Sequence, residues 1–309
     1  MDGVLVVDKP RGITSHDVVA VARRALGEKR IGHTGTLDPL ATGVLALACG
    51  RATRLVRFLS ASDKDYEATI RFGLVTDTYD ITGNTLERSE QHPEREAVVR
   101  AIAELRGKYL QVPPPYSAKK VDGTRAYTRA RRNEPVALTP SLVFVERAEP
   151  VVFTDDSVTV AITCSAGFYV RSFAHELGGK VGTGACLEAL RRTRSGDFSL
   201  QQAASLAVLS DTAGQHGLAH SIVAMGQLLP ELAAVCVTES GRSHLAHGRE
   251  LRSGGDYRSG IGDRGSGISG SGLESWRNWV RVLDEEGCLL ALAQPGTTHG
   301  SLHPSVVLI

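Results

Sequence analysis

The sequence is poor in cysteine, in aromatic residues and in long apolar runs. Its 309 residues include five scattered cysteines without a CxxC pair, and aromatic residues make up 5%. Such cysteines are typical of reduced, buried thiols and provide no zinc framework. No segment approaches the roughly 20 consecutive apolar residues of a membrane helix, and the first residues lack the basic and apolar regions of a signal peptide. We therefore expect a cytoplasmic protein without membrane contact.

Several common catalytic motifs are missing as well. The sequence contains no GxSxG elbow, no Walker GxxxxGK[ST] loop and no HExxH zinc motif. The segment GIGDRG matches GxGxxG, but neither a buried strand before it nor a helix after it is expected, so it does not indicate dinucleotide binding. These absences predict chemistry by side chains alone, with no metal and no cofactor.

The net charge of +1 hides an uneven distribution of charge. Residues 100 to 132 contain nine basic residues and only two acids, a local net charge of +7, and three tyrosines are interleaved with them. Localised positive charge with aromatic side chains suits phosphate neutralisation and base stacking. A solvated basic face is the alternative. The segment favours a nucleic-acid partner.

The pattern of apolar residues predicts helices and strands that interleave irregularly. VLVVD at residues 4–8 reads as a strand, and Thr14 or Ser15 caps a helix that ends at Gly27. Further strands are expected at DYEATIRFG, SLVFVERAEP and SVTVAITCSAG, and a helix at residues 94–105. Since no βαβ rhythm is present, the fold class is α+β, with a mixed, largely antiparallel sheet flanked by helices.

The later part of the chain predicts two more helices and a change of domain. FYVRSFAHELGGK reads as a strand end entering a helix, and LEALRRTRSGDF as a helix and turn. A boundary near residues 229–234 divides a first domain, 1–230, from a β-rich domain, 234–309. There, WRNWVRVLDEEGCLLALAQPG predicts two strands joined by a turn, and a Gly/Ser-rich segment at about 253–273 predicts a mobile loop.

One carboxylate lies in an unusual loop. Asp38 lies in the segment HTGTLDPLATG, where Pro39 restricts the backbone and the glycines allow conformations that other residues rarely adopt. An apolar, strand-like run follows this segment. The direction of its side chain is therefore well specified. This pattern fits a functional acid, although a well-placed turn aspartate has the same features.

Several longer motifs resemble one family. The runs GVLVVDKPRGITSHDVV, IGHTGTLDPLATGVL, KDYEATIRFGLVTDTYDITG, GKYLQVPPPYSAKKVDGTRAY, CSAGFYVRSFAHELG and LEALRRTRSGDF are similar, in this order, to those of the TruB family of pseudouridine synthases. The resemblance covers roughly residues 3–200, and a looser similarity to a PUA-type RNA-binding domain follows. It implies conversion of uridine 55 in the T-loop of tRNA to pseudouridine, without cofactor, metal or obligatory protein partner.

The resemblance also implies a set of site residues. Asp38 matches the family's catalytic carboxylate, and Arg171 matches its charge partner, because a guanidinium favours an ionised acid. An extruded uridine needs an aromatic face, which matches Tyr66, whose phenol is suited to proton movement at C5. Three more positions match substrate contacts: His33, Tyr169 and Leu190.

Other matched residues support the site or the RNA. Lys9 and Pro10 are expected to brace the catalytic loop, and Asp77 and Asp80 to have mainly structural roles in a polar turn. The candidates for contacts with RNA phosphates are Lys119, Lys120, Arg191, Arg192 and Arg194.

Three other functions fit parts of the sequence. The first alternative is a tRNA chaperone with secondary catalysis, and the second is a guide-RNA-dependent pseudouridine synthase that needs partner proteins. The third is a carboxylate glycosidase. A glycosidase normally needs two acids flanking the bond, and no second acid stands in the matched motifs.

Overall fold

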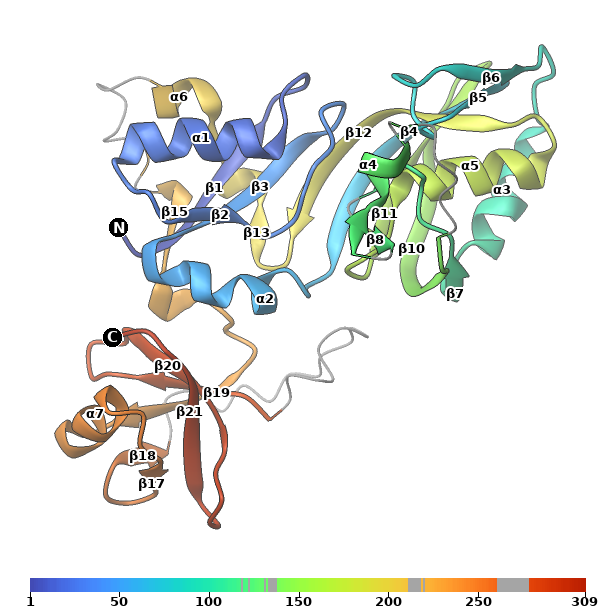
Figure 1. The fold of residues 1–309 in the computed structure, drawn as a ribbon. Coiled ribbons are helices and arrows are strands. Elements are labelled where there is room, and N and C mark those ends of the chain that lie inside the picture. Colours follow the sequence, from blue (N-terminus) through green and yellow to red (C-terminus); the bar gives the residue numbers. More distant parts are fainter. Residues whose placement is uncertain are drawn as a thin grey trace.

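The computed structural model describes residues 1–117, 119–121, 123–130, 132, 138–210, 218, 220–259 and 278–309. Within these residues two large sheets dominate the fold (Figure 1). The strands of the first sheet are β1 (Gly3–Lys9), β2 (Ile31–His33), β3 (Thr42–Cys49), β4 (Lys64–Phe72), β7 (Gly107–Gln111), β10 (Ser141–Phe153), β11 (Ser157–Cys164), β12 (Ala185–Ser195), β13 (Phe198–Ser199), β14 (Ala204–Ser205) and β15 (Ile222–Ala224).

The first sheet is mixed and largely antiparallel, as predicted. Its main path runs β14-β1-β3-β12-β4-β11-β10-β7, with β2, β13 and β15 attached at the side. Strands β1 and β14 are parallel, as are β12 and β3, whereas the other neighbours along the path are antiparallel. Two small hairpins lie outside the sheet: β5 (Leu74–Thr76) with β6 (Thr85–Arg88), and β8 (Lys120–Val121) with β9 (Thr124–Arg125).

Strand β1 shows why the sheet has a core on each face. Successive side chains of a strand point to opposite faces, and here Leu5 and Val7 join one hydrophobic cluster while Val4 and Val6 join another. Helices cover both faces. They are α1 (Ser15–Leu26), α2 (Val56–Leu59), α3 (Arg95–Glu104), α4 (Ala126–Ala130), α5 (Val170–Val181) and α6 (Leu206–Ser210), with a 3₁₀ segment, η1 (Gly50–Leu55), before α2.

The first helix begins and ends as the sequence predicts. The Thr14 side chain accepts a hydrogen bond from the Asp17 backbone, and Asp17 bonds back to Thr14, which completes a capping box. Gly27, with φ of 61°, ends the helix in the left-handed conformation that glycine favours. Helix α1 then packs its apolar side on the cluster that contains Leu5 and Val7. Its first turn thereby lies close to the loop of Asp38.

The prediction of a helix at LEALRRTRSGDF is wrong, because residues 185–195 form strand β12 in the middle of the sheet. This strand pairs with β4 on one side and with β3 on the other. Helix propensities differ by only tenths of a kcal/mol per residue, so the pairing of a central strand overrides them. Two register shifts, at Leu187/Ala189 and Arg192/Arg194, alter the alternation of its side chains.

The C-terminal part is β-rich, as predicted, and its sheet runs β17-β21-β20-β19-β16-β18 (Figure 1). The expected strand pair around the DEEG turn is confirmed, since β19 and β20 are antiparallel. The elements are β16 (Ala233–Val237), α7 (Glu239–Ala246), β17 (Leu251–Arg252), β18 (Tyr257–Ser259), β19 (Val280–Leu283), β20 (Leu289–Pro295) and β21 (Ser301–Val307).

The second hydrophobic cluster joins the two sheets. It contains Val4 and Phe58 from the first part of the chain and Trp279 and Leu292 from the C-terminal part. The rings of Phe58 and Trp279 meet edge to face with centroids 4.8 Å apart. The division into domains 1–230 and 234–309 remains a prediction, and the two parts share a core at their junction.

The predicted Gly/Ser-rich loop at 253–273 lies mostly outside the described residues, which omit 260–277. Its first part differs from the prediction, because Tyr257–Ser259 form strand β18 against β16. Among the described residues, no helix is long and apolar enough to cross a membrane.

Candidate active site

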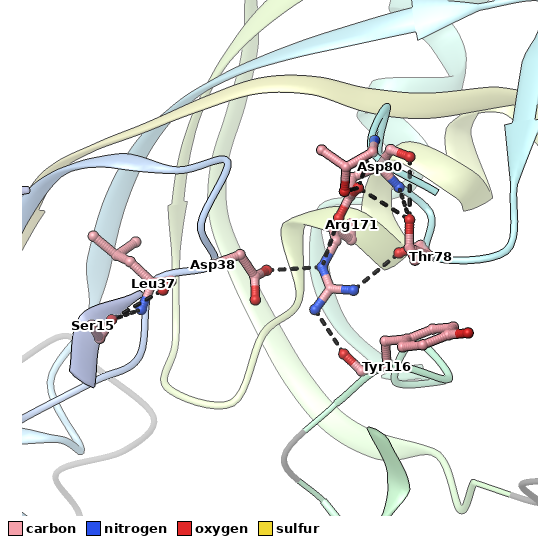
Figure 2. Close-up of polar contacts among 8 residues, drawn as sticks. Ser15, Leu37, Asp38, Thr78, Asp80, Tyr116 and Arg171 are labelled. Carbon is pink, nitrogen blue, oxygen red and sulfur yellow. Dashed lines mark hydrogen bonds and ion pairs between the residues drawn. The ribbon is translucent and has the colours of Figure 1, made fainter. Parts of the chain in front are cut away.

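The loop of Asp38 is held by hydrogen bonds of its neighbours. The Ser15 hydroxyl donates to the Leu37 carbonyl at 3.0 Å and accepts from the Leu37 amide at 2.8 Å (Figure 2). The Gly12 amide donates to the Pro39 carbonyl at 2.7 Å. The backbone is thus held on both sides of the acid, at Leu37 and at Pro39, while the Asp38 side chain itself remains 39% exposed. The carboxylate is directed by its backbone and open to a ligand.

Arg171 lies opposite this carboxylate, in the first turn of α5. Its Nε is 2.9 Å from Asp38 Oδ2, and its side chain is 7% exposed. Its Nη1 donates to the Thr78 carbonyl at 3.0 Å, and its Nη2 donates to the Tyr116 carbonyl at 2.9 Å. As Figure 2 shows, the guanidinium is held from three directions. It is a fixed positive charge next to an accessible acid.

Asp80 is a buried part of the same arrangement. Its Oδ2 is 3.8 Å from Arg171 Nε, and its side chain is 8% exposed. Its Oδ1 accepts hydrogen bonds from the Thr78 hydroxyl and from the amide and hydroxyl of Thr82. Asp77, nearby, accepts from the amide and side chain of Asn84. Both acids stabilise the turn that carries the Thr78 carbonyl, which fits the structural role expected from the sequence.

Three predicted side chains lie within electrostatic reach of Asp38. Burial lowers the pKa of Lys9 to about 8, while the Asp38 carboxylate opposes this change. Burial raises the pKa of the Tyr66 and Tyr169 phenols, and Asp38 raises both further. The cationic neighbours Arg192 and Arg171 act in the opposite direction on Tyr66 and Tyr169 respectively. The charge of Asp38 thus acts on the pKa of the predicted lysine and of both predicted tyrosines, while Arg171 contacts Asp38 directly.

Lys9 is positioned as a brace. Its side chain is fully buried, and its Nζ donates to the carbonyls of Pro10 and Ile13 at 2.9 and 2.8 Å. These bonds close the turn between β1 and α1, which also carries Gly12, a partner of the Asp38 loop. The expected bracing role of Lys9 agrees with this geometry.

Comparison with known proteins identifies the family of the chain. The family model of the TruB family pseudouridylate synthase N-terminal domain matches residues 23–170, and that of the tRNA pseudouridylate synthase B C-terminal domain matches residues 171–230. The tRNA pseudouridine synthase B of Solibacter usitatus (strain Ellin6076) is 45% identical over 252 residues, which are 81% of this chain and 86% of the relative.

The chain belongs to the TruB family of pseudouridylate synthases.

Other relatives and solved structures agree with this assignment. The tRNA pseudouridine synthase B of Thermobifida fusca (strain YX) is 49% identical over 214 residues, 66% of this chain and 73% of the relative. A chain in the crystal structure of a Cbf5–Nop10–Gar1 complex has a TM-score of 0.72 and 25% identity, and the match covers 99% of this chain and 85% of that one. A chain in an archaeal box H/ACA sRNP Nop10–Cbf5 complex, at 24% identity and a TM-score of 0.71, shows the fold alone.

Two further predicted contacts of this TruB-family chain lie on the sheet. His33 ends β2, and its Nδ1 is buried with no hydrogen-bond partner among the described residues. Burial lowers the pKa of His33, and Arg192 lowers it further. Leu190 is 8% exposed and belongs to the main core cluster, against which Tyr66 packs. Contact of either residue with a nucleotide stays a prediction.

Arg192 is not the exposed phosphate contact that the sequence suggests. Its side chain is 2% exposed. Its Nε donates to the Val44 carbonyl at 2.7 Å and its Nη2 to the Gly35 carbonyl at 3.1 Å. A phosphate of a folded RNA cannot reach a guanidinium enclosed in this way. The error follows from the wrong helix prediction, which did not place Arg192 on the inner face of a strand.

The other candidates for RNA contact lie nearer the surface. Arg191 is bound to Asp8 at 2.8 Å and lines a cavity of about 570 Å³ together with Lys9. Arg194 pairs with Asp65 at 2.7 Å. The Lys119 ammonium donates to the Ser141 hydroxyl. The side chain of Lys120 lies outside the described residues. Phosphate binding by these residues remains a prediction.

Gln111 is a functional candidate that the sequence analysis missed. Its side chain accepts from the Tyr169 amide at 2.8 Å and donates to the Tyr169 carbonyl at 3.2 Å, so it holds both ends of that residue's backbone. Its Nε2 also lies 3.2 Å from the Tyr109 hydroxyl. The signal in the sequence is a glutamine at the end of a strand, directly before VPPP, at a position that is 1% exposed.

Proposed function

We propose that this protein converts uridine 55 in the T-loop of tRNA to pseudouridine, with Asp38 as the catalytic carboxylate and Arg171 as its charge partner. The observation that carries the proposal is the ion pair of 2.9 Å, in which the acid is 39% exposed and the arginine 7%. The relatives named tRNA pseudouridine synthase B support the substrate class. Such an enzyme works in the cytoplasm, where tRNA matures.

The chemistry is an isomerisation. The C1′–N1 glycosidic bond breaks, the uracil turns, and C1′ joins C5. The proton of C5 leaves and N1 gains one, so atoms and charge balance without oxidation. A single carboxylate suffices, either by attack on ribose C1′ or uracil C6 or by removal of a sugar proton. Arg171 keeps the carboxylate charged, because a neighbouring cation favours the ionised acid. Since the guanidinium is fixed, it also orients the carboxylate without reorganising during the reaction.

The pocket for the extruded base consists of side chains around the ion pair. Tyr66 supplies an aromatic face and a phenol for proton movement at C5, and Tyr169 supplies a second ring. His33 fills the space that the flipped nucleotide leaves. The basic segment at residues 106–132 and the PUA-like C-terminal part hold the T-stem-loop through its phosphates.

The alternative is the guide-RNA-dependent branch, which the match of 99% of this chain to a chain in a Cbf5–Nop10–Gar1 complex keeps open. The identity of that chain is 25%, against 41–49% for the relatives named tRNA pseudouridine synthase B. The higher identity favours a stand-alone enzyme, which needs no protein partner.

The test is pseudouridine mapping in an unmodified T-stem-loop incubated with the purified chain alone. We expect turnover by the wild type, none by Asp38→Asn, and unchanged turnover by Asp155→Asn, an exposed acid in the turn between β10 and β11. RNA binding should survive Asp38→Asn, because the substitution removes a negative charge. Turnover by Asp38→Asn contradicts the proposal.

The remaining functions give other results in the same assay. Release of free uracil would identify a glycosidase. Activity that appears only with a guide RNA and partner proteins would identify the guided enzyme. A biological effect on tRNA folding that persists in Asp38→Asn would show that the chaperone role is separate from catalysis.

A further inference from the structure

Arg192 is the largest fully buried side chain of the described residues, and it lies beside the proposed site. Two glycines lie against this residue. A Cβ on Gly43, where φ is 101°, would lie 2.1 Å from the Arg192 carbonyl oxygen, and a Cβ on Gly35 would lie 3.6 Å from Nη1. Both glycines belong to the motif around Asp38. Glycine at position 43 thus allows its strand to approach the backbone of Arg192 closely, whereas a Cβ at position 35 would make an ordinary contact with the guanidinium.

The guanidinium has neutral partners where a carboxylate is usual. It donates to the carbonyls of Val44 and Gly35, and in the part of the chain that the structure describes no ion pair joins it to an acid. Its charge is therefore not cancelled locally. The positive field of Arg192 lowers the pKa of three neighbouring basic groups, Lys9, His33 and Lys64, in addition to the effect of their burial.

A buried charge without a counterion is costly, and a purely structural bridge between two carbonyls does not require one. Asn or Gln side chains also donate to carbonyls and carry no charge. The arrangement therefore indicates that the positive charge itself is used. The question is which group in the site gains from it.

The phenol of Tyr66 is the group that Arg192 faces. The two residues are direct partners across strands β4 and β12, so their side chains leave the sheet on the same face. Burial raises the pKa of the Tyr66 phenol, and the charge of Arg192, its neighbour across the strands, opposes this rise. An arginine beside a phenol stabilises the phenolate, because the anion accepts the stronger hydrogen bond.

We propose that Arg192 is a positioning residue whose guanidinium holds a positive charge close to the Tyr66 oxygen. This charge stabilises the phenolate and so enables Tyr66 to accept the proton from C5 of the rejoined uracil. This inference rests on the proposed function, in which Tyr66 contacts the base. In the step, the phenol first gives its proton to N1, which the break of the glycosidic bond has freed. The C5–H bond then breaks, its electron pair restores the C5–C6 double bond, and the proton passes to the phenolate oxygen, which becomes a phenol again. The proton that N1 gains balances the turnover.

The proposal explains the use of two arginines in one site. Arg171 pairs with Asp38, which acts when the glycosidic bond breaks. Arg192 stabilises the phenolate of Tyr66, which acts after the base has been reattached. Each acid–base group thereby has its own immobile cation, and the neutral partners of Arg192 leave its charge available to the phenol.

The decisive experiment measures the phenol without relying on catalysis. 3-Nitrotyrosine is incorporated at position 66, where its nitrophenol titrates near neutral pH and reports by visible absorbance. We expect its apparent pKa to rise by about one pH unit or more in Arg192→Gln, because an opposite charge at close range is removed. Arg194→Gln is the matched control, since Arg194 lies on the same strand but pairs with Asp65, and it should leave the titration in place.

A conservative variant covers the case in which Arg192→Gln does not fold. Arg192→Lys keeps the charge but loses the planar fork, so the nitrophenol pKa should rise less than with glutamine. The pH–rate profile of single-turnover pseudouridine formation should move to higher pH in the same order. An unchanged nitrophenol titration in both Arg192 variants overturns the role of Arg192. Full turnover by Tyr66→Phe overturns instead the role of Tyr66 in the proposed function.

Discussion

The two sides of the Asp38–Arg171 ion pair are built in opposite ways. On the acid side, the loop backbone is fixed by Ser15 and Gly12, and the carboxylate itself extends 39% exposed. On the arginine side, the backbone of α5 is an ordinary helix, and it is the guanidinium that is fixed, by Thr78, Tyr116 and Asp80. One side orients a chain segment, whereas the other immobilises a charged group.

The difference fits the proposed roles of the two groups. A reacting carboxylate must approach a substrate atom, so it cannot be enclosed, and its direction is set through the peptides beside it. A charge partner does not react, and it stabilises best when it does not reorganise. The burial of Arg171 is tolerated because its guanidinium is hydrogen-bonded and paired.

The largest expected effect comes from breaking the arginine side. Arg171→Met leaves Asp80 buried without its cation and Asp38 without its partner, so we expect a loss of about 3–5 kcal/mol of unfolding free energy and no measurable turnover. Chemical denaturation and pseudouridine mapping measure the two effects. Arg147→Met is the control, because Arg147 pairs with Glu149 at the surface and should cost about 1 kcal/mol or less. Equal losses in both variants would show that the enclosed position of Arg171 has no special weight.

A smaller effect is expected from loosening the acid side. Ser15→Ala removes both hydrogen bonds to the Leu37 peptide and leaves buried backbone groups unpaired, which should cost about 1–3 kcal/mol. Since the carboxylate is then less well directed, single-turnover rates should fall while RNA affinity stays near that of the wild type. Ser305→Ala, an exposed serine of β21, is the control. A normal rate in Ser15→Ala would mean that the loop orients Asp38 without this clamp.

The smallest expected effect concerns Glu176, a partly buried acid on α5, the helix that carries Arg171. Burial raises the pKa of Glu176, on α5, to about 7 from its usual 4.5. Between these values the folded protein keeps a proton that the unfolded chain releases, so stability falls as pH rises from about 4.5 to 7. Glu176→Gln should remove this loss and stabilise the protein by about 1–2 kcal/mol at pH 8, less than the full shift implies because solvent screens the group.

Thermal unfolding of wild type and Glu176→Gln across pH 4–8 measures this effect, and the two curves should converge at the acid end. Glu104→Gln provides the contrast, because Glu104 is exposed and its pKa is lowered by Lys180. A constant difference between wild type and Glu176→Gln at all pH values would contradict the buried, protonated state of Glu176.

Local patterns in the sequence predicted several ends of helices and strands and the loop of Asp38, but they missed strand β12. Thr14, Gly27 and the apolar run VLVVD of β1 are short-range signals, and each appears in the structure as expected. Strand β12 was missed because the residues of LEALRR favour a helix when taken alone. Only pairing with β3 and β4 makes it a strand.

The wrong helix prediction for this segment also affected the expectations for Arg191 and Arg192. Neighbouring side chains of a strand point to opposite faces, so Arg191 lines a cavity with Asp8 while Arg192 is buried. The choice between them depends on register and on the shift at Arg192/Arg194, which no local pattern reveals. The pairing of Asp38 with Arg171, by contrast, was available from family motifs, because those motifs retain long-range contacts that composition and periodicity cannot express.

The junction between the two sheets limits how the chain can be shortened. The Arg51 side chain donates to the Leu308 carbonyl at 2.7 Å, and Arg54 donates to that of Val307. The segment with both arginines directly follows β3, which begins where the Asp38 loop ends. Trimming the last few residues would therefore remove the acceptors of Arg51 and Arg54, and a fusion tag is better attached elsewhere.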